Sequence, residues 1–330
     1  MTPIIDQIIT EESAWTSRSV SGKEGLTRRL TREEIEAFAE TIGKAKHRDV
    51  TQLTAADFRH PQLAPLMADI RRLVMVGRGV VVLNGVDVNS WSQDQCERAF
   101  WGIGQNLGYA AVQSSRADRI GYVRDEPDDP KRRGYRSSGE LVLHTDSREI
   151  IALMALRPAA RGGETIVASS SAIHNIIRAE RPELLPALYR GHPYHSTEVG
   201  VTECAIPVFS SVDGHLSCMF FEEHIRRAAK TTGQPLPADL DEALSFFASV
   251  ARRPDVCIEF LLNPGEMLFC NNFVVLHARN KFEDSAQTQR LLARLWINVP
   301  EGRPTTPELH VRSRWFDEHH DPVLMATAPA

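Results

Sequence analysis

The stretch LVLHTDSREIIALMAL, residues 141–156, decides most about the fold of this 330-residue chain. It holds two apolar runs of strand length, with a short polar stretch between them that begins at His144 and includes Asp146. Residues i and i+2 of a β-strand project to the same face, so this imidazole and carboxylate can bind one metal ion. The ordinary alternative is a buried histidine held by a nearby aspartate, and the spacing alone leaves both interpretations open.

The same His-x-Asp spacing occurs twice more, at His47/Asp49 and at His319/Asp321. The first pair lies in "KAKHRDVT" and the second in "FDEHHDPV", and neither has an apolar strand beside it. Such surroundings are typical of a solvated surface. We therefore expect neither pair to bind a metal.

A third candidate ligand, His277, ends the apolar run "MLFCNNFVVLH". Two histidines and one carboxylate occupy one face of an octahedral iron(II) ion and leave positions for a cosubstrate and dioxygen. The same three groups can also hold zinc for hydrolysis. The residues therefore predict a metal centre at His144, Asp146 and His277 and leave the metal open between iron and zinc.

Two arginines, Arg290 and Arg294, belong to the β-like run "RLLARLWINV" that follows. A buried guanidinium needs an anion, and its planar fork matches a carboxylate in two hydrogen bonds. The period of two places both arginines on one face, and we favour Arg294 because Leu292, Leu295 and Trp296 flank it. The alternative is a strand-edge arginine whose charged end reaches solvent.

Composition argues against several classes of protein. The chain is 42% hydrophobic and 25% charged, with a net charge of -5 and no basic block that would bind nucleic acid. Its longest apolar run, residues 150–156, is too short to cross a bilayer, and its N-terminus lacks signal-peptide features. The five cysteines form no C-x-x-C pair, which indicates reduced thiols. We expect a cytoplasmic protein with a small-molecule substrate and no nucleic-acid or membrane partner, and we allow for a homo-oligomer.

The order of the predicted elements favours a single catalytic domain that is mainly β with flanking helices. Residues 1–75 are expected to be mainly helical, residues 79–300 to form a jelly-roll core, and residues 301–330 to extend it. A helical insertion is expected at about residues 172–251. The regular strand–helix alternation of a parallel α/β fold is absent from the pattern.

Local signals place several of these elements. Thr31 and Glu34 make a capping box in front of a helix, and a second helical pattern covers residues 63–74. Ser92 begins a third helix, and residues 212–214 form the turn of a β-hairpin.

Three separated stretches together resemble a known family. They are "LVLHTDSREIIALMALRPAARGGETIVASSSAIHNII", "PGEMLFCNNFVVLHARNKFED" and "RLLARLWINV". In this order they are similar to the taurine dioxygenase-like branch of the iron(II)/2-oxoglutarate dioxygenases, which includes clavaminate synthase-like enzymes. The resemblance spans roughly residues 79–300, and the N-terminal helical region carries none of it.

This resemblance implies a fold, a set of site residues and a reaction. The fold is a distorted double-stranded β-helix, a cupin-like jelly roll. The iron ligands would be His144, Asp146 and His277, and Thr165 with Arg294 would bind the distal carboxylate of 2-oxoglutarate. The reaction would use dioxygen, release succinate and carbon dioxide, and most simply hydroxylate a C–H bond of a small molecule.

The residues that bind the substrate are harder to select. Arg148 and Arg279 each lie two residues beyond a candidate ligand, where a guanidinium can attract an anionic substrate. Tyr135 and Asn272 are further candidates for the pocket wall, and each of the four has an equally ordinary structural role. The polar loop at residues 124–140 precedes the first candidate ligand, as a lid over the site would.

Two other functions stay open from the residues alone. A zinc hydrolase would use the same three ligands without oxygen or 2-oxoglutarate and would give Arg294 no role. A non-catalytic β-barrel binding module would tolerate Asp146→Ala without loss of function.

Overall fold

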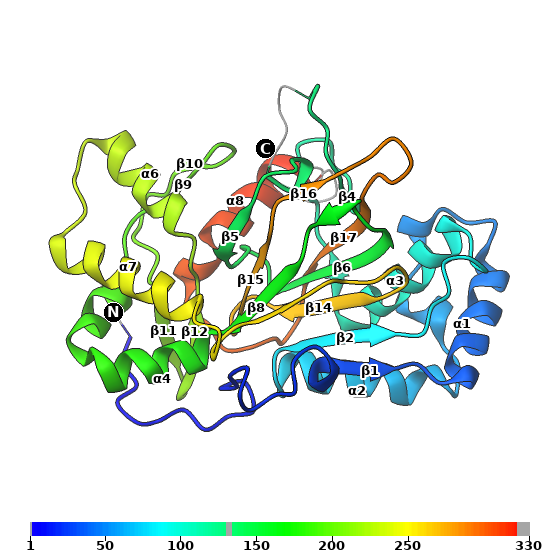
Figure 1. Ribbon diagram of the computed structural model, residues 1–330, viewed down its shortest axis with the longest axis horizontal. Coiled ribbons are helices and arrows are strands. Elements are labelled where there is room, and N and C mark those ends of the chain that lie inside the picture. Colours follow the sequence, from blue (N-terminus) through cyan, green and yellow to red (C-terminus); the bar gives the residue numbers. More distant parts are fainter. Residues whose placement is uncertain (1, 130–133, 322–330) are drawn as a thin grey trace.

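Two β-sheets face each other at the centre of the molecule, with helices outside both of them (Figure 1). The computed structural model describes residues 2–129 and 134–321. The larger sheet has the order β1-β2-β14-β6-β17-β3, with β4 also paired to β17. Its strands are β1 (Thr27–Arg29), β2 (Val80–Asn84), β3 (Tyr109–Ala110), β4 (Gly121–Val123), β6 (Ile150–Arg157), β14 (Met267–Asn271) and β17 (Leu291–Asn298).

The smaller sheet has the order β13-β8-β15-β5. Its strands are β5 (Leu141–His144), β8 (Thr165–Ser169), β13 (Ile258–Phe260) and β15 (Val275–Arg279). Three short pairs lie outside the two sheets: β7 (Arg161–Gly162) with β16 (Phe282–Glu283), β9 (His195–Ser196) with β10 (Gly200–Val201), and β11 (Phe209–Val212) with β12 (His215–Cys218).

The strand sequences are apolar on both faces because both faces of each sheet are covered. On β2, Val80 and Val82 pack between the sheets, while Val81 and Leu83 pack against helices on the outside. On β15, Val275 points between the sheets and Leu276 packs outward. The layers are therefore helix, sheet, sheet and helix.

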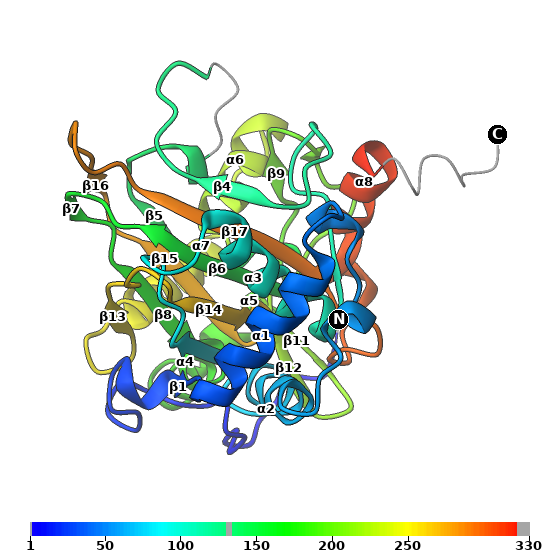
Figure 2. The same cartoon turned by 90° about the vertical axis from the view of Figure 1, so that its right-hand side faces the viewer.

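Different helices cover the two outer faces. The helices α1 (Arg32–Ala45), α2 (Leu63–Met75) and α3 (Gln93–Leu107) pack on the larger sheet, and Figure 2 shows α1 and α3 in front of its strands. The smaller sheet is covered by α4 (Ser170–Glu180), α5 (Leu185–Arg190) and α7 (Ala238–Ala251). Two further helices are α6 (Glu222–Thr232) and α8 (Val311–His320). None of the helices within the described ranges has the length and apolar composition that a bilayer span requires.

Several predictions from local signals are confirmed. The capping box of Thr31 and Glu34 precedes α1, Ser92 caps α3, and β11 and β12 form the expected hairpin. The fold class is confirmed as mainly β with flanking helices and two sheets of the double-stranded β-helix type. Among the described residues these two sheets stay separate and do not close into a barrel.

The prediction for the N-terminal region was partly wrong. Between residues 2 and 31 the described chain holds no α-helix, and Thr27–Arg29 forms the edge strand β1 beside β2. The helix α6 lies within the helical insertion expected at about residues 172–251, whereas α8 was not predicted from the sequence. Both of them reach the functional site, as described below.

One buried histidine makes stability depend on pH. His174 on α4 is fully buried between the rings of Tyr189 and Phe209. Burial lowers its pKa to about 4, with the charge of Arg178 acting in the same direction. Because this folded-state pKa lies below the usual 6.5, the unfolded chain binds more protons between the two values. Stability is therefore complete above about pH 6.5 and falls by about 1.4 kcal/mol per pH unit toward pH 4.

This effect is measurable by urea unfolding at about pH 7 and about pH 5.5. The free energy of unfolding of the His174→Gln variant is expected to fall by about 1 kcal/mol less than that of the wild type over this range. His47→Gln, at an exposed position, is the control and should match the wild type. An identical pH dependence in His174→Gln and wild type would contradict the assignment.

Candidate metal centre and cosubstrate pocket

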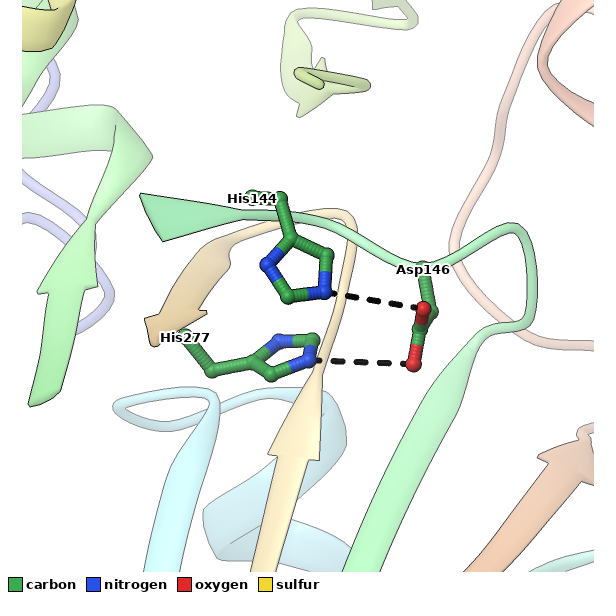
Figure 3. A group of neighbouring side chains, drawn as sticks. All are labelled: His144, Asp146 and His277. Carbon is green, nitrogen blue, oxygen red and sulfur yellow. Dashed lines mark ion pairs between the residues drawn. The ribbon is translucent and has the colours of Figure 1, made fainter. Parts of the chain in front are cut away.

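The side chains of His144, Asp146 and His277 meet at one point (Figure 3). The distance from His144 Nε2 to Asp146 Oδ1 is 3.8 Å, and that from His277 Nε2 to Asp146 Oδ2 is 3.7 Å. One ligand atom from each residue lies within 4.8 Å of the others. The structure thus brings together the three residues that the sequence selected as metal ligands.

Strand register places the two imidazoles side by side. In the antiparallel pair of β5 and β15, His144 lies directly opposite His277, and their ring centroids are 4.4 Å apart. Asp146 lies just beyond the end of β5, and its backbone N–H donates to Asn272 Oδ1 at 3.1 Å. The Asn272 amide also donates to the Arg148 carbonyl at 2.9 Å. Asn272 therefore shapes the loop that carries the carboxylate.

The protonation of these groups suits a divalent metal. His144 Nδ1 is 2.7 Å from the Val142 carbonyl, which favours the tautomer with its proton on Nδ1 and leaves Nε2 as a lone-pair donor. Burial, with the neighbouring His144, lowers the pKa of His277 to about 3, so His277 is neutral near pH 7. Burial alone would raise the pKa of Asp146, but His277, His144 and Arg294 hold it below its usual range. Two imidazoles and one carboxylate are ligand types that fit iron(II) or zinc.

Trp296 on β17 orients the carboxylate, a role that the sequence analysis missed. Its Nε1 donates to Asp146 Oδ2 at 2.7 Å. Outer hydrogen bonds of this kind typically contribute 10–100-fold to metal affinity. We therefore expect Trp296→Phe to weaken iron(II) binding by about 10-fold or more, measured by anaerobic titration. Trp315→Phe, where the ring stacks on His319, is the matched control, and unchanged affinity in Trp296→Phe would remove this role.

The three side chains open into a cavity of about 720 Å³. One end of it holds Thr165, Arg279 and Arg290. Thr165 on β8 lies directly opposite Arg279 on β15, and Arg279 follows His277 by two residues on the same face of the strand. Arg279 and Arg290 both lie 5.0 Å from the ring of Phe282. This end is therefore beside the metal site and is lined by two arginines and a hydroxyl.

The two arginines at this end are buried and have donors without an acceptor among the described residues. Arg279 Nη2 donates to the Ser137 carbonyl at 2.7 Å, but its Nε and Nη1 and the Nη1 of Arg290 find no acceptor among the described residues. Burial lowers the pKa of Arg279 to about 10 and that of Arg290 to about 9, and repulsion from Arg279 adds to the effect on Arg290. Buried cations with unused donors are stabilised by a bound anion.

Arg294 also lines the cavity and packs on Trp296, which donates to the ligand Asp146. Its Nε donates to Gln113 Oε1 at 2.7 Å, and its guanidinium lies 3.8 Å from the ring centroid of Tyr135 and 4.5 Å from that of Trp296. Its charge lowers the pKa of Asp146. Arg290 and Arg294 thus both line the cavity with different neighbours. Arg290 packs on Phe282 together with Arg279, whereas Arg294 packs on Tyr135 and Trp296.

The four predicted substrate residues separate into two groups. Tyr135 and Arg279 line the cavity. Arg148 and Asn272 do not belong to its lining within the described chain, which corrects their selection. The Arg148 guanidinium forms two hydrogen bonds to Asp317 at 2.6 and 2.7 Å, and Asn272 is held by the loop contacts given above.

Helices and loops that carry no sequence motif supply the rest of the wall. Residues 130–133 of the predicted lid loop lie outside the described residues, and Tyr135 and Arg136 beyond them line the cavity. Further lining residues come from the β9–β10 hairpin, α6 and α8: Ser196, Thr197, Glu198, Val199, His224, Arg227, Arg312 and Phe316. Charge or polarity could have suggested all of them except Val199 and Phe316.

Comparison with known proteins agrees with this geometry. Residues 34–296 match the family described as "Taurine catabolism dioxygenase TauD, TfdA family", so the resemblance begins earlier than residue 79 and includes the N-terminal helices. The chain is 30% identical over 336 residues to FR-33289 synthase of Streptomyces rubellomurinus, covering 96% of this chain and 97% of that protein. It is 36% identical over 154 residues to a uridine-5'-phosphate dioxygenase of a Streptomyces species, covering 45% of this chain and 56% of that protein.

Solved structures share the fold at low sequence identity. Asparagine oxygenase in complex with Fe(II), a hydroxyasparagine and succinate has a TM-score of 0.66 at 16% identity, over 83% of this chain and 93% of that one. The non-heme iron oxygenase OrfP with Fe and alpha-ketoglutaric acid has a TM-score of 0.63 at 15% identity, over 86% and 99%. These matches favour neither a zinc hydrolase nor a binding module. The chain belongs to the taurine catabolism dioxygenase TauD, TfdA family and is an iron(II)- and 2-oxoglutarate-dependent dioxygenase.

Proposed function

We propose that His144, Asp146 and His277 bind the iron(II) ion and that the enzyme hydroxylates a C–H bond of a small anionic molecule. The observation that carries this proposal is the meeting of the three side chains beside two buried arginines with unused donors. When bound, iron with 2-oxoglutarate and dioxygen supplies the oxidising chemistry, with succinate and carbon dioxide as coproducts. The protein would hold these groups in place in the cavity.

Arg290 and Thr165 are proposed to hold the distal carboxylate of 2-oxoglutarate, with Arg279 beside them. Thr165 and Arg279 lie opposite each other beside the metal site, where they would hold one carboxylate of a dicarboxylate whose other end the metal binds. Nη1 of Arg290 has no acceptor among the described residues and could donate to such an anion. The negative charge of the anion would offset the repulsion between the guanidinium groups of Arg279 and Arg290. This assignment transfers to Arg290 the role first expected of Arg294.

Arg294 is then proposed to face the substrate. Its guanidinium is held in place by Gln113, Tyr135 and Trp296, close to the metal ligands, where a reacting substrate must lie. A fixed guanidinium there favours a substrate with an anionic group. The name of one relative, uridine-5'-phosphate dioxygenase, describes an anionic substrate and supports the same class.

The remaining sequence-based expectations stay predictions. They are a single catalytic domain, a cytoplasmic location, no nucleic-acid or membrane partner, and a homo-oligomer as one allowed state. A charged cavity that can enclose a small molecule is consistent with the expected kind of substrate.

The function is tested by adding iron(II) and 2-oxoglutarate to the protein without oxygen. The expected result is the weak visible absorption of the iron–2-oxoglutarate chelate, followed by succinate release when oxygen and a substrate are admitted. Zinc in place of iron is the control and should give neither signal. Folded protein that binds iron(II) but shows no chelate band and releases no succinate would exclude the proposed function.

A further inference from the structure

Two of the three metal ligands lie where the smaller sheet supports them least. His277 belongs to β15, which lies between β8 and β5 and is paired on both sides. His144 ends β5, which is the edge strand of this sheet in the described chain, and Asp146 lies just beyond it. An edge strand has one row of backbone groups without a neighbouring strand. Ligands placed there need support from outside the sheet to keep a fixed geometry.

The segment between β12 and α6, residues 219–221, gives this support and is called the β12–α6 connector below. Thr145, the residue between the two ligands, is fully buried. Its backbone N–H donates to the Phe220 carbonyl at 2.7 Å, and the Phe220 N–H donates to Thr145 Oγ1 at 2.9 Å. The hydroxyl oxygen thus takes the place of the carbonyl that a second strand would offer. The connector therefore pairs with the chain at the position between the two ligands.

The last residue of the connector, Phe221, holds the first imidazole. Its ring packs on that of His144, with centroids 4.7 Å apart and an angle of 32° between the planes. On its other neighbour, His224 of α6, the Phe221 ring stacks at 4.0 Å. The His144 imidazole is therefore held by two rings, those of Phe221 and His277, and by its hydrogen bond to the Val142 carbonyl. Such ring contacts restrict the rotation of the imidazole.

The connector is itself anchored in the core. The Met219 N–H donates to the Val208 carbonyl at 2.9 Å, and the Tyr194 hydroxyl donates to the Met219 carbonyl at 2.7 Å. The ring of Phe220 is 1% exposed and stacks on Phe247 of α7 with centroids 4.1 Å apart. Supporting residues that are locked by packing and hydrogen bonds hold a site precisely. The connector therefore transfers the rigidity of the helical layer to the metal centre.

We propose, resting on the metal site of the proposed function, that Thr145 and Phe221 are positioning residues of the metal centre. Thr145 fixes the backbone between the two ligands, and Phe221 fixes the plane of the His144 imidazole. The Thr145 hydroxyl is engaged by Met219 and Phe220, and Phe221 has no atom that binds a metal, so both residues act through the ligands. Ligands that are held in advance in the binding geometry bind the metal more tightly.

Thr145→Val tests the hydrogen bond. The substitution keeps the shape of the side chain and leaves the Phe220 N–H without its acceptor. Anaerobic titration is expected to show iron(II) binding that is about 10-fold weaker or more. Thr145→Ser restores the hydroxyl and should return the affinity to within about threefold of the wild type. Thr41→Val is the matched control, because Thr41 is also buried but bonds to the backbone of α1, and its iron(II) affinity should be unchanged.

Phe221→Leu tests the ring contact. Leucine keeps a half-buried apolar side chain and frees the His144 imidazole to rotate. Iron(II) binding should weaken by about threefold or more, and the visible band of the iron–2-oxoglutarate chelate should shift in wavelength. A loss of stability alone would not shift the band of folded protein. Phe246→Leu is the matched control, since Phe246 is also half-buried and packs against the same core, and it should change neither quantity.

The failure of these roles differs from the failure of the dioxygenase function. Unchanged iron(II) affinity and an unchanged band in either folded variant would remove the role of that residue and leave the function standing. A wild-type protein that binds no iron(II) would end the proposed function and the positioning roles together. If Thr145→Val does not fold, Phe221→Leu decides the proposal, because its ring is partly exposed and less important for the core.

Discussion

Asp146→Ala is expected to lose substrate oxidation and the iron–2-oxoglutarate chelate band together. The substitution removes the only carboxylate among the three candidate ligands and leaves two imidazoles that face each other at a centroid distance of 4.4 Å. Turnover should fall by more than about 100-fold. Loss of a residue that only hydrogen-bonds a metal ligand costs up to about 100-fold, and loss of the ligand itself should cost more. Succinate release and anaerobic iron(II) titration measure the two effects.

The chain offers a matched control for this experiment. Asp49→Ala removes the carboxylate of an identical His-x-Asp spacing at an exposed position, and it should leave iron affinity and turnover unchanged. Retained turnover in Asp146→Ala would contradict the assignment of this carboxylate. It would instead fit the binding-module interpretation, which tolerates its loss.

Arg290→Gln is expected to weaken the binding of 2-oxoglutarate by about 30-fold or more. Removing one partner of a buried charge pair typically costs about 2 kcal/mol or more, which corresponds to a factor of this size. The substitution also removes the repulsion from Arg279, so the fold should not suffer. Titration of the chelate band with 2-oxoglutarate measures the change, and iron(II) affinity should stay within about threefold.

Arg294→Gln distinguishes the two arginines of β17. It should alter 2-oxoglutarate binding by less than about threefold and should chiefly weaken the binding of the substrate. Arg157→Gln, an exposed position on the neighbouring strand β6, is the control for both variants. The reverse result, with the loss in Arg294→Gln, would restore the role that the sequence first indicated for Arg294.

Local sequence determined much of the fold, because each signal involves residues that are neighbours along the chain. The capping box of Thr31 and Glu34 needs only one helical turn, and it correctly begins α1. The continuous apolar run that forms β2 follows from a sheet covered on both faces. The same reasoning missed α8, whose ends lack strong caps and whose face is fixed by Trp296 and Arg148, far away in sequence.

The metal centre was partly determined by sequence. Three histidines are followed two residues later by an aspartate, but only His144 ends an apolar strand. This sequence context distinguished His144 from His47 and His319. The convergence with His277 depends on the register of β5 against β15, which joins positions 133 residues apart in the sequence. Family resemblance supplied that link, and spacing alone left it open.

Only the tertiary structure decided the roles of the arginines. The period of two predicted that Arg290 and Arg294 lie on one face of the strand, and closeness in sequence to Asp146 suggested Arg148 as a substrate residue. The direction of a long side chain, however, depends on contacts with residues that are distant in the sequence. Gln113 and Tyr135 hold Arg294 near the metal, and Asp317 draws Arg148 out of the cavity. The direction of a guanidinium is set by packing and by charges brought together through folding, and a linear pattern does not contain that information.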